Sequence, residues 1–258
     1  METLKIVKIG GHVLNDEGAL DAFLNDFSQI ASPKILVHGG GKLATALAKQ
    51  MNIEVQMNDG RRITNAETLD IITMVYSGKI NTTIVAKLQA KSTNAMGFSG
   101  ADGNSIVAEK RPVKDINYGY VGDIKKVNTT HLQLLLNHGI TPVFCAITHD
   151  ANGQLLNTNA DTVASELAIA FAETYMTELY YCFEKNGVLK DINQDDSVIE
   201  TIDTKNYQQL LKENIIADGM LPKLTNCFHA IDHHVKKVHI GTSAMLLNKN
   251  ITHTIIQK

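Results

Sequence analysis

Two glycine-rich segments are the clearest candidates for chemistry. Residues 8–11, KIGG, end a short apolar run, and residues 38–41, HGGG, end the next one directly before a helical pattern. Consecutive glycines let a backbone turn sharply and aim N–H groups at an anion, and a helix N-terminus strengthens that attraction. Both segments therefore predict phosphate or carboxylate binding, although each could be only a structural turn. We interpret His38 as a packed residue and not as a base.

Two later segments place polar residues where helices are expected to begin. Residues 157–161, NTNAD, and residues 218–223, DGMLPK, precede or open apolar-periodic stretches. Asn and Asp favour helix starts for capping reasons alone, and Pro222 suits a first helical turn. Taken alone, each segment is therefore an ordinary helix start. It indicates a functional site only in combination with the two glycine-rich segments.

The elements that must position these residues alternate along the chain. Short apolar runs between helical patterns are typical of an α/β fold, in which a mainly parallel sheet carries helices on both faces and binds ligands at the carboxyl ends of its strands. Strands are predicted at residues 4–9, 34–38, 140–147, 178–183 and 237–240. Helices are predicted at residues 16–31, 42–51, 64–76, 130–138, 159–173, 205–212 and 220–233.

Other segments predict turns and hairpins. Asn58-Asp59-Gly60 has the residues of a hairpin turn, and Thr64 followed by Glu67 predicts a capping box. Residues 95–127 are rich in glycine and short strand-like pieces, which predicts hairpins at the flank of the sheet.

Composition narrows the class of protein. The 258 residues are 44% hydrophobic, enough for a sizeable core, and the formal net charge of -3 argues against a nucleic-acid partner. The three cysteines are far apart and without metal-binding spacing, so we expect buried free thiols in a reducing compartment. No signal peptide or membrane span is evident, and we expect a cytoplasmic protein without a membrane partner.

Taken together, the motifs resemble the amino acid kinase family, and within it the acetylglutamate kinases. The matching strings are KIGG at 8, HGGG at 38, GRRIT at 60, SGADG at 99, LNTNAD at 156 and IIADGMLPK at 215. They are specific in combination and span nearly the whole chain. The resemblance implies a single three-layer domain over 1–258, with an acyl-amino-acid lobe at about 1–177 and a nucleotide lobe at about 178–258.

The resemblance also implies an activity: transfer of phosphate from ATP, with Mg²⁺, to the γ-carboxylate of N-acetyl-L-glutamate in arginine biosynthesis. Lys8 and Lys223 would stabilise the phosphoryl group in flight, and Asp161 would hold both ammonium groups. The implied substrate-binding residues are Gly40, Gly41, Arg62 and Asn157, and the phosphate-binding residues are Gly10 and Gly11. The implied nucleotide-binding residues are Glu184, Lys185, Asn186, Gly187, Val188, Leu189, Ile215, Ile216 and Ala217.

This chemistry agrees with the residue types. A glutamate carboxyl is already ionised at neutral pH, so no general base is needed, and charge neutralisation dominates the transfer of phosphate between anions. Alternatives remain at this point: N-succinyl-glutamate or another acceptor, or a non-catalytic amino-acid sensor of the same fold. A dinucleotide-binding oxidoreductase is excluded because no G-x-G-x-x-G pattern follows the first strand.

Some segments depart from the family pattern. Residues 183–187, FEKNG, lack an aspartate that relatives usually carry, and residues 252–258 lack a usual glycine, which leaves the last strand open. We interpret the His233-His234 pair as a solvated helix end and predict no protein-bound metal. Arginine-inhibited members carry an additional N-terminal helix, whereas here the first strand starts close to Met1. We therefore expect an arginine-insensitive homodimer.

Overall fold

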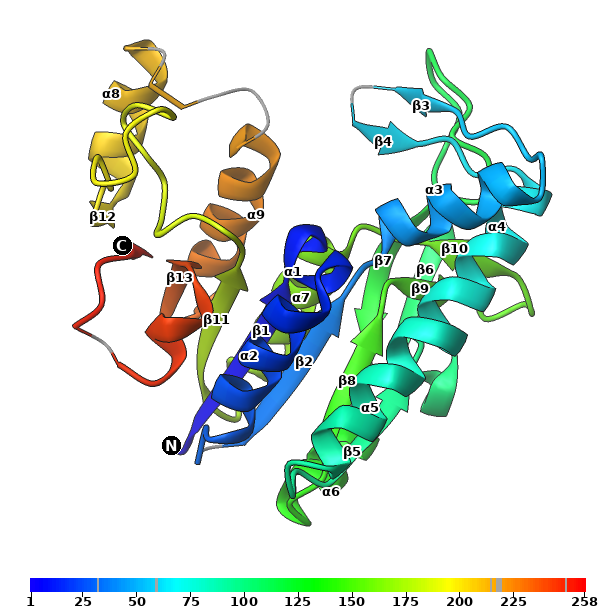
Figure 1. Cartoon of the computed structure of the whole chain (residues 1–258), viewed down its shortest axis with the longest axis horizontal. Coiled ribbons are helices and arrows are strands. Elements are labelled where there is room, and N and C mark those ends of the chain that lie inside the picture. The colour runs from blue at the N-terminus through cyan, green and yellow to red at the C-terminus, as the bar shows by residue number, and fades with distance from the viewer. Residues whose placement is uncertain (32, 59, 214, 217–219, 249) are drawn as a thin grey trace. The chain divides into compact units, whose positions relative to one another are not determined.

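The computed structural model describes residues 1–31, 33–58, 60–213, 215–216, 220–248 and 250–258. The chain divides into two compact units (Figure 1). The first combines Met1–Ile35 with Ala164–Lys258, and the second is Leu36–Val163. This division does not show which part of the chain binds which substrate. The predicted boundary at about residue 177, between an acyl-amino-acid lobe and a nucleotide lobe, therefore stays a prediction.

The first unit contains a mainly parallel sheet in the order β12-β14-β13-β11-β1. Only the β13–β14 pair is antiparallel. Most residues of its inner strands are buried, as expected for strands covered on both faces. The strands are β1 (Thr3–Ile9), β11 (Met176–Cys182), β12 (Thr201–Ile202), β13 (Lys237–Gly241) and β14 (Thr254–Ile256).

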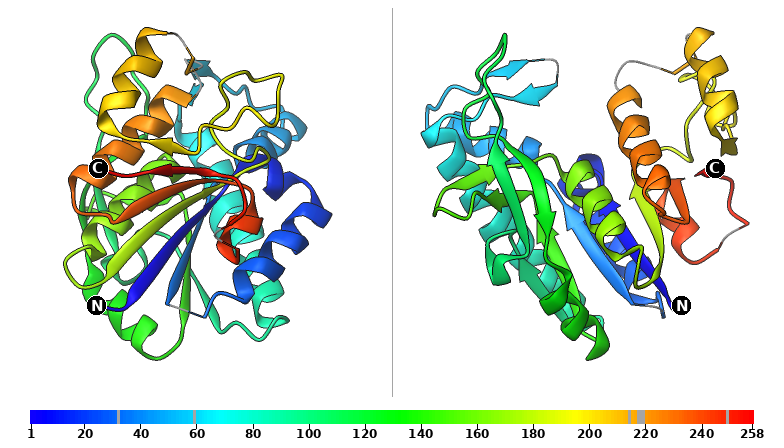
Figure 2. Two further views of the ribbon diagram at one scale, coloured as in Figure 1. Left: turned by 90° about the vertical axis from the view of Figure 1, so that its left-hand side faces the viewer. Right: turned by 180° about the vertical axis from the view of Figure 1, so that it is seen from behind.

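Helices cover both faces of this sheet. Figure 2 shows α2 and the 3-10 helix η4 over one face, and α7 and α9 over the other. Including α1 and α8, the helices are bounded as follows: α1 (Gly11–Asn15), α2 (Glu17–Ser28), α7 (Ala160–Phe171), α8 (Thr204–Lys212), α9 (Leu221–Asp232) and η4 (Ser243–Leu246). None of the described helices is long and apolar enough to cross a membrane.

Helix α2 shows how local chemistry sets its ends. The Asp16 side chain accepts a hydrogen bond from the backbone N–H of Ala19 and caps the first turn. At the other end, buried Lys34 donates 2.9 Å hydrogen bonds to three carbonyl oxygens, those of Phe27, Ser28 and Ile30. These carbonyls lie where the helix leaves backbone acceptors unpaired, so the lysine stabilises the helix end.

The second unit contains the parallel strands β2, β8 and β5, in that order, and a separate four-stranded sheet in the order β10-β9-β6-β7. A short antiparallel hairpin joins β3 to β4. The strands are β2 (Lys34–His38, which begins in the first unit), β3 (Met57–Asn58), β4 (Arg61–Arg62), β5 (Ala95–Phe98), β6 (Ile106–Lys110), β7 (Gly122–Val127), β8 (Thr141–Cys145), β9 (Ile147–His149) and β10 (Leu155–Asn157).

One helical rod of the second unit runs through three consecutive segments (Figure 1): α4 (Ala66–Thr73), the π-helix η1 (Met74–Ile80) and α5 (Asn81–Gln89). The helix predicted through Tyr76 therefore continues beyond that residue, to Gln89. The predicted capping box is wrong, because Asn65 is the N-cap and accepts from the N–H of Thr68. The other helices are α3 (Gly41–Gln50), the 3-10 turn η2 (Asp102–Asn104) and α6 (Thr129–Asn137).

Most predicted strands and helices are confirmed close to their expected bounds. The predicted strand at 140–147 splits into β8 and β9. Residues 95–127 form the predicted hairpin only in part, because β6 and β7 pair antiparallel whereas β5 joins β8 in the parallel sheet. The predicted hairpin turn includes Asp59, which lies outside the described residues.

Two glycines have the same left-handed backbone conformation but differ in the space around them, which predicts different effects of substitution on stability. Gly119 and Gly139 have φ values of 70° and 69°. A Cβ atom at Gly119 would overlap the carbonyl oxygen of Thr64 and lie 2.8 Å from its carbonyl carbon, whereas no atom lies within 4 Å of a Cβ at Gly139.

Gly139→Ala should therefore cost only the left-handed conformational penalty, about 1–2 kcal/mol. Gly119→Ala should lower the free energy of unfolding by about 2–5 kcal/mol, because overpacking adds to that penalty. Urea denaturation of both variants measures the difference, and equal losses would contradict the account.

Candidate functional site

The turn at residues 38–41 has no room for a side chain at its centre. A Cβ atom at Gly40 would overlap Cδ1 of Ile80 and lie 2.9 Å from Cδ1 of Tyr76. Helix α3 begins at Gly41, so the predicted glycine turn before a helix is confirmed. The first N–H groups of a helix lack intrahelical acceptors and attract anions, so this turn can hold a phosphate or a carboxylate.

Arg62 is anchored to this turn from the β3–β4 hairpin. Its Nη2 donates hydrogen bonds to the carbonyl oxygen of Gly41 (3.0 Å) and to Oγ1 of Thr45 (2.8 Å). Oγ1 of Thr45 in turn donates to the same carbonyl at 2.9 Å. Within the part of the chain that the structure describes, Nε and Nη1 of Arg62 have no hydrogen-bond acceptor. Nε and Nη1 do not share an edge of the guanidinium, but each keeps an N–H group that can donate to an oxygen of a bound anion.

Asn157 is tied to the segment that carries Arg62. At the end of β10, its Nδ2 donates to Oγ1 of Thr64 at 3.0 Å, and its backbone N–H donates to the carbonyl of Tyr120 at 2.8 Å. Thr64 follows Arg62 closely in the chain. The second unit thus brings together Gly40, Gly41 and Arg62 at the turn, with Asn157 linked to them through Thr64.

Asp161 lies in the first turn of α7, as predicted. Asn159 is the capping residue of this helix, since its Oδ1 accepts from the N–H groups of Asp161 (2.8 Å) and Thr162 (3.1 Å). The capping interpretation of this segment is therefore correct for Asn159. The cap is made by the side chain of Asn159 and not by the carboxylate of Asp161.

In the first unit, both predicted catalytic lysines lie beside one tyrosine. Lys8 is the register partner of Tyr181 in the parallel β1–β11 pair, so the two side chains leave the sheet on the same face. Lys223, on α9, places its Nζ 5.0 Å from the centroid of the Tyr181 ring. A ring face attracts a cation, and this ring is 1% exposed. The sequence analysis did not single out Tyr181.

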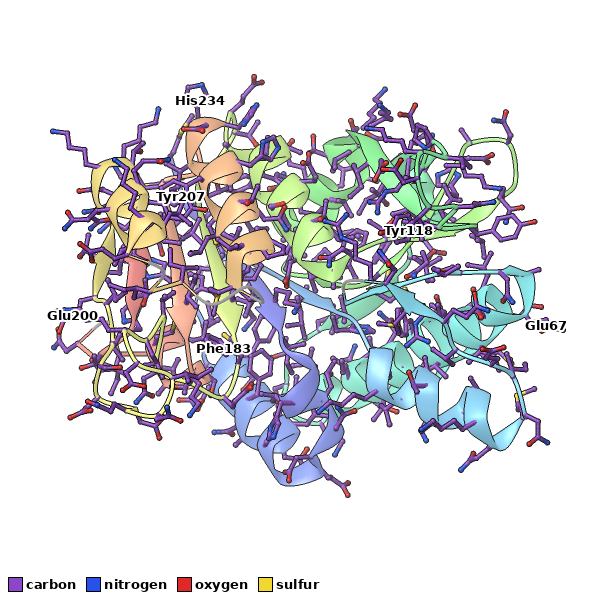
Figure 3. The ribbon with its side chains drawn as sticks, turned by 90° about the horizontal axis from the view of Figure 1, so that it is seen from above. Glu67, Tyr118, Phe183, Glu200, Tyr207 and His234 are labelled. Atoms are coloured by element: carbon purple, nitrogen blue, oxygen red, sulfur yellow. The ribbon has the colours of Figure 1, made fainter. Side chains whose placement is uncertain are left out.

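The turn at Gly10 and Gly11 is also crowded on one side. The N–H of Gly10 donates to the carbonyl of Cys182 at 2.7 Å. A Cβ at Gly10 would lie 3.0 Å from that oxygen and 3.3 Å from Cβ of Phe183, a residue labelled in Figure 3. Gly11 differs, because no atom lies within 4 Å of its Cβ position. The phosphate-binding role of both glycines stays a prediction.

Residues 184–189 are fastened by the last strand of the sheet. The N–H of Val188 donates to Oγ1 of Thr254 at 2.8 Å, and this hydroxyl donates to the carbonyl of Ile199 at 2.7 Å. A Cβ at Gly187 would lie 2.6 Å from the same oxygen. The strand left open in the sequence therefore exists as β14 and positions the candidate nucleotide loop. No sequence signal pointed to Thr254, because its partners lie far away in the chain.

Three other candidate nucleotide-binding residues of the first unit, Lys185, Ile215 and Ile216, make different contacts. Lys185 forms an ion pair with Asp195 at 2.7 Å. The N–H of Ile215 donates to the carbonyl of Leu210 at 3.1 Å at the end of α8, and Ile216 is buried. Ala217 lies outside the described residues.

The cysteines and the histidine pair behave as structural residues. Cys145, Cys182 and Cys227 are free and buried, as predicted. Burial raises the pKa of the Cys182 thiol, although the charge of Lys8 opposes the shift. His233 and His234 are exposed at the C-terminal end of α9, where Figure 3 labels His234, in agreement with a solvated helix end.

His38 is completely buried and neutral. Its Nδ1 donates to the carbonyl of Gly39 at 2.8 Å, and its Nε2 accepts from the Asn81 amide at 3.0 Å. Burial lowers the pKa of His38 from 6.5 to about 4, while the hydrogen bond to Gly39 opposes the shift. The structure agrees with the interpretation of His38 as a packed residue.

This depressed pKa predicts an acid-sensitive stability. Between about pH 6.5 and 4 the unfolded chain binds a proton at His38 that the folded chain does not, so stability should fall by about 3 kcal/mol as pH falls through this window. Denaturant unfolding at several pH values measures the slope. His38→Gln should remove that part of the slope even if it lowers stability at pH 7, and an unchanged slope would show that other groups cause it.

Comparison with known sequences gives two kinds of match. The sequence model of the amino acid kinase family matches residues 3–242. A protein of Cytophaga hutchinsonii named acetylglutamate kinase is 52% identical over 98% of this chain and 97% of its own length. A protein of Phocaeicola vulgatus with the same name is 51% identical over 100% of this chain and 99% of its own length.

Among solved structures, smu.665 from Streptococcus mutans UA159 has a similar fold. The TM-score is 0.81 at 22% identity, and the match covers 98% of this chain and 98% of that one. This likeness and the mainly parallel strand pairing confirm the predicted α/β fold class. From the family match over most of its length and its relatives at about half identity, the chain belongs to the amino acid kinase family.

Proposed function

We propose that this protein transfers the terminal phosphoryl group of ATP to the γ-carboxylate of N-acetyl-L-glutamate, giving N-acetylglutamyl 5-phosphate in arginine biosynthesis. The names of relatives about 50% identical over nearly the full chain support this acceptor. The structural observation that carries the proposal is Arg62, which is anchored through Nη2 and keeps N–H donors at Nε and Nη1 for a carboxylate.

The mechanism depends on charge and position. The acceptor carboxylate is already ionised, so the main barrier is the approach of two anions, and fixed cations and N–H groups lower it. Lys8 and Lys223 would neutralise the phosphoryl group in flight, and their shared neighbour Tyr181 supports this pairing. Asp161 would orient the ammonium groups.

Backbone N–H groups at Gly10, Gly11, Gly40 and Gly41 would bind the moving phosphoryl group and the acceptor. ATP would enter as its Mg²⁺ complex, in which phosphate oxygens and water supply most of the metal's ligands. This mode needs few protein ligands. Among the described residues there is no group of three His, Cys, Asp or Glu positioned to hold a metal.

We propose that the acceptor and the nucleotide use different parts of the chain. The candidate acceptor residues Gly40, Gly41, Arg62 and Asn157 all belong to the second unit, whereas residues 184–189, 215 and 216 belong to the first. This distribution supports separate acceptor and nucleotide lobes. A cytoplasmic homodimer is proposed as well, on the resemblance to the family.

The acceptor class gives the first functional prediction. A side-chain carboxylate yields an acyl phosphate, which hydroxylamine converts to a hydroxamate, whereas a phosphate ester does not react in this way. We expect ADP release only with an acceptor present, and hydroxamate from N-acetylglutamate. Free glutamate should be poorer, because its ammonium group would be desolvated without a partner.

A panel with N-acetylglutamate, N-succinylglutamate and free glutamate tests this expectation and identifies the acyl group. ADP release without hydroxamate would reject a carboxylate acceptor. No ADP release with any acceptor would favour an amino-acid sensor of the same fold.

Arg62 gives a second prediction with a matched control. Arg62→Lys keeps the charge but loses the planar pair of donors, so the acceptor KM should rise roughly ten- to a hundredfold while the ATP KM barely changes. Arg61→Lys, at the exposed neighbour on β4, should leave both KM values near those of the parent. Equal effects of Arg62→Lys on both KM values would contradict its role as an acceptor clamp.

A further inference from the structure

Tyr76 lies in an unusual helical segment against the glycine turn. It belongs to the seven-residue π-helix η1, and π-helical turns are rare and often occur at functional sites. Its ring forms one wall of the turn, since Cδ1 and Cε1 lie 2.9 and 3.0 Å from a Cβ atom placed at Gly40. The residue is 6% exposed. The wide helical turn therefore presses an aromatic ring onto the candidate anion site.

The hydroxyl end of this ring points to the same place as the arginine. Oη of Tyr76 and Nη2 of Arg62 each lie 3.8 Å from the position of a Cβ atom at Gly41. No residue that the structure describes makes a hydrogen bond with this Oη. The ring is buried, but this hydroxyl is not fully buried, so it is open to a partner that arrives with a ligand.

The chemistry of the two groups limits what that ligand is. A guanidinium has only donors and cannot accept the phenol proton. Burial raises the pKa of Tyr76, and the charge of Arg62 only partly opposes the shift, so the phenol stays protonated at neutral pH. A donor and a fixed cation side by side match an oxygen anion.

We propose that Tyr76 is a substrate-binding residue, whose hydroxyl donates a hydrogen bond to the carboxylate that Arg62 clamps. In the proposed function this is the α-carboxylate of the N-acyl-glutamate, so the inference rests on that function. The ring would hold the glycine turn in place, and the hydroxyl would add to the recognition of the acceptor.

Tyr76→Phe tests the hydroxyl without removing the ring. The acceptor KM and the Kd of N-acetylglutamate by calorimetry should both rise roughly ten- to a hundredfold, as expected for a lost hydrogen bond to a charged group, with ATP KM unchanged. Tyr175→Phe is the matched control, because Tyr175 is also 6% exposed but packs edge-on against Phe171 in the first unit. It should leave both constants unchanged.

A second ligand locates the contact. N-acetylisoglutamine replaces the α-carboxylate with a neutral carboxamide, so the penalty from Tyr76→Phe should shrink to a few-fold. An equal penalty with both ligands would place the hydroxyl elsewhere, and no penalty with either would overturn the proposal. If the parent protein binds N-acetylglutamate but releases no ADP, the kinase function fails while the calorimetric test of Tyr76 still stands. If it binds no N-acetylglutamate, both fail.

Discussion

The close contact at Gly40 is the constraint on which the acceptor side of the structure depends. A side chain there would overlap Ile80 and press into Tyr76, so the π-helix can lie against the turn only because this position is bare. That contact brings the start of α3 next to the rod formed by α4, η1 and α5. The anchored guanidinium of Arg62 then completes the surroundings of the turn. The arrangement of several residues from distant parts of the sequence thus depends on the absence of a Cβ atom at Gly40.

In the first unit, the placement of the predicted catalytic Lys8 depends on the register between two strands. The parallel β1–β11 pair sets Lys8 opposite Tyr181, and α9 brings Lys223 to the same ring. A shift of one residue would turn Lys8 to the opposite face of the sheet, because side chains alternate along a strand. Buried apolar neighbours on both faces oppose such a shift. Hydrophobic packing therefore secures the face of the sheet from which Lys8 projects.

Much of the fold could be predicted because its signals are local. Apolar runs gave the parallel strands, and glycine turns before helices gave the candidate anion sites. The hairpin predicted for residues 95–127 rested on their glycine content and does not include β5, which pairs with β8 in parallel. In the structure Gly97 allows close contact with α5, since a Cβ there would overlap Oδ1 of Asn81 and lie 3.1 Å from its Cγ. Tyr76, Tyr181 and Thr254 could not be predicted, because their importance comes from contacts with residues remote in sequence.

The first unit is built from two stretches of chain that the whole second unit separates. During synthesis on the ribosome, β1 emerges early, whereas its parallel partner β11 follows only after Leu36–Val163 has been made. The second unit is continuous and has its complete set of local partners as soon as it emerges. At roughly 5–20 residues per second, β1 lacks its β11 neighbour for on the order of ten seconds, so that edge of the strand stays exposed. A nascent chain in this state is a natural client for chaperones, and crowding or slow translation in this interval would favour aggregation over folding.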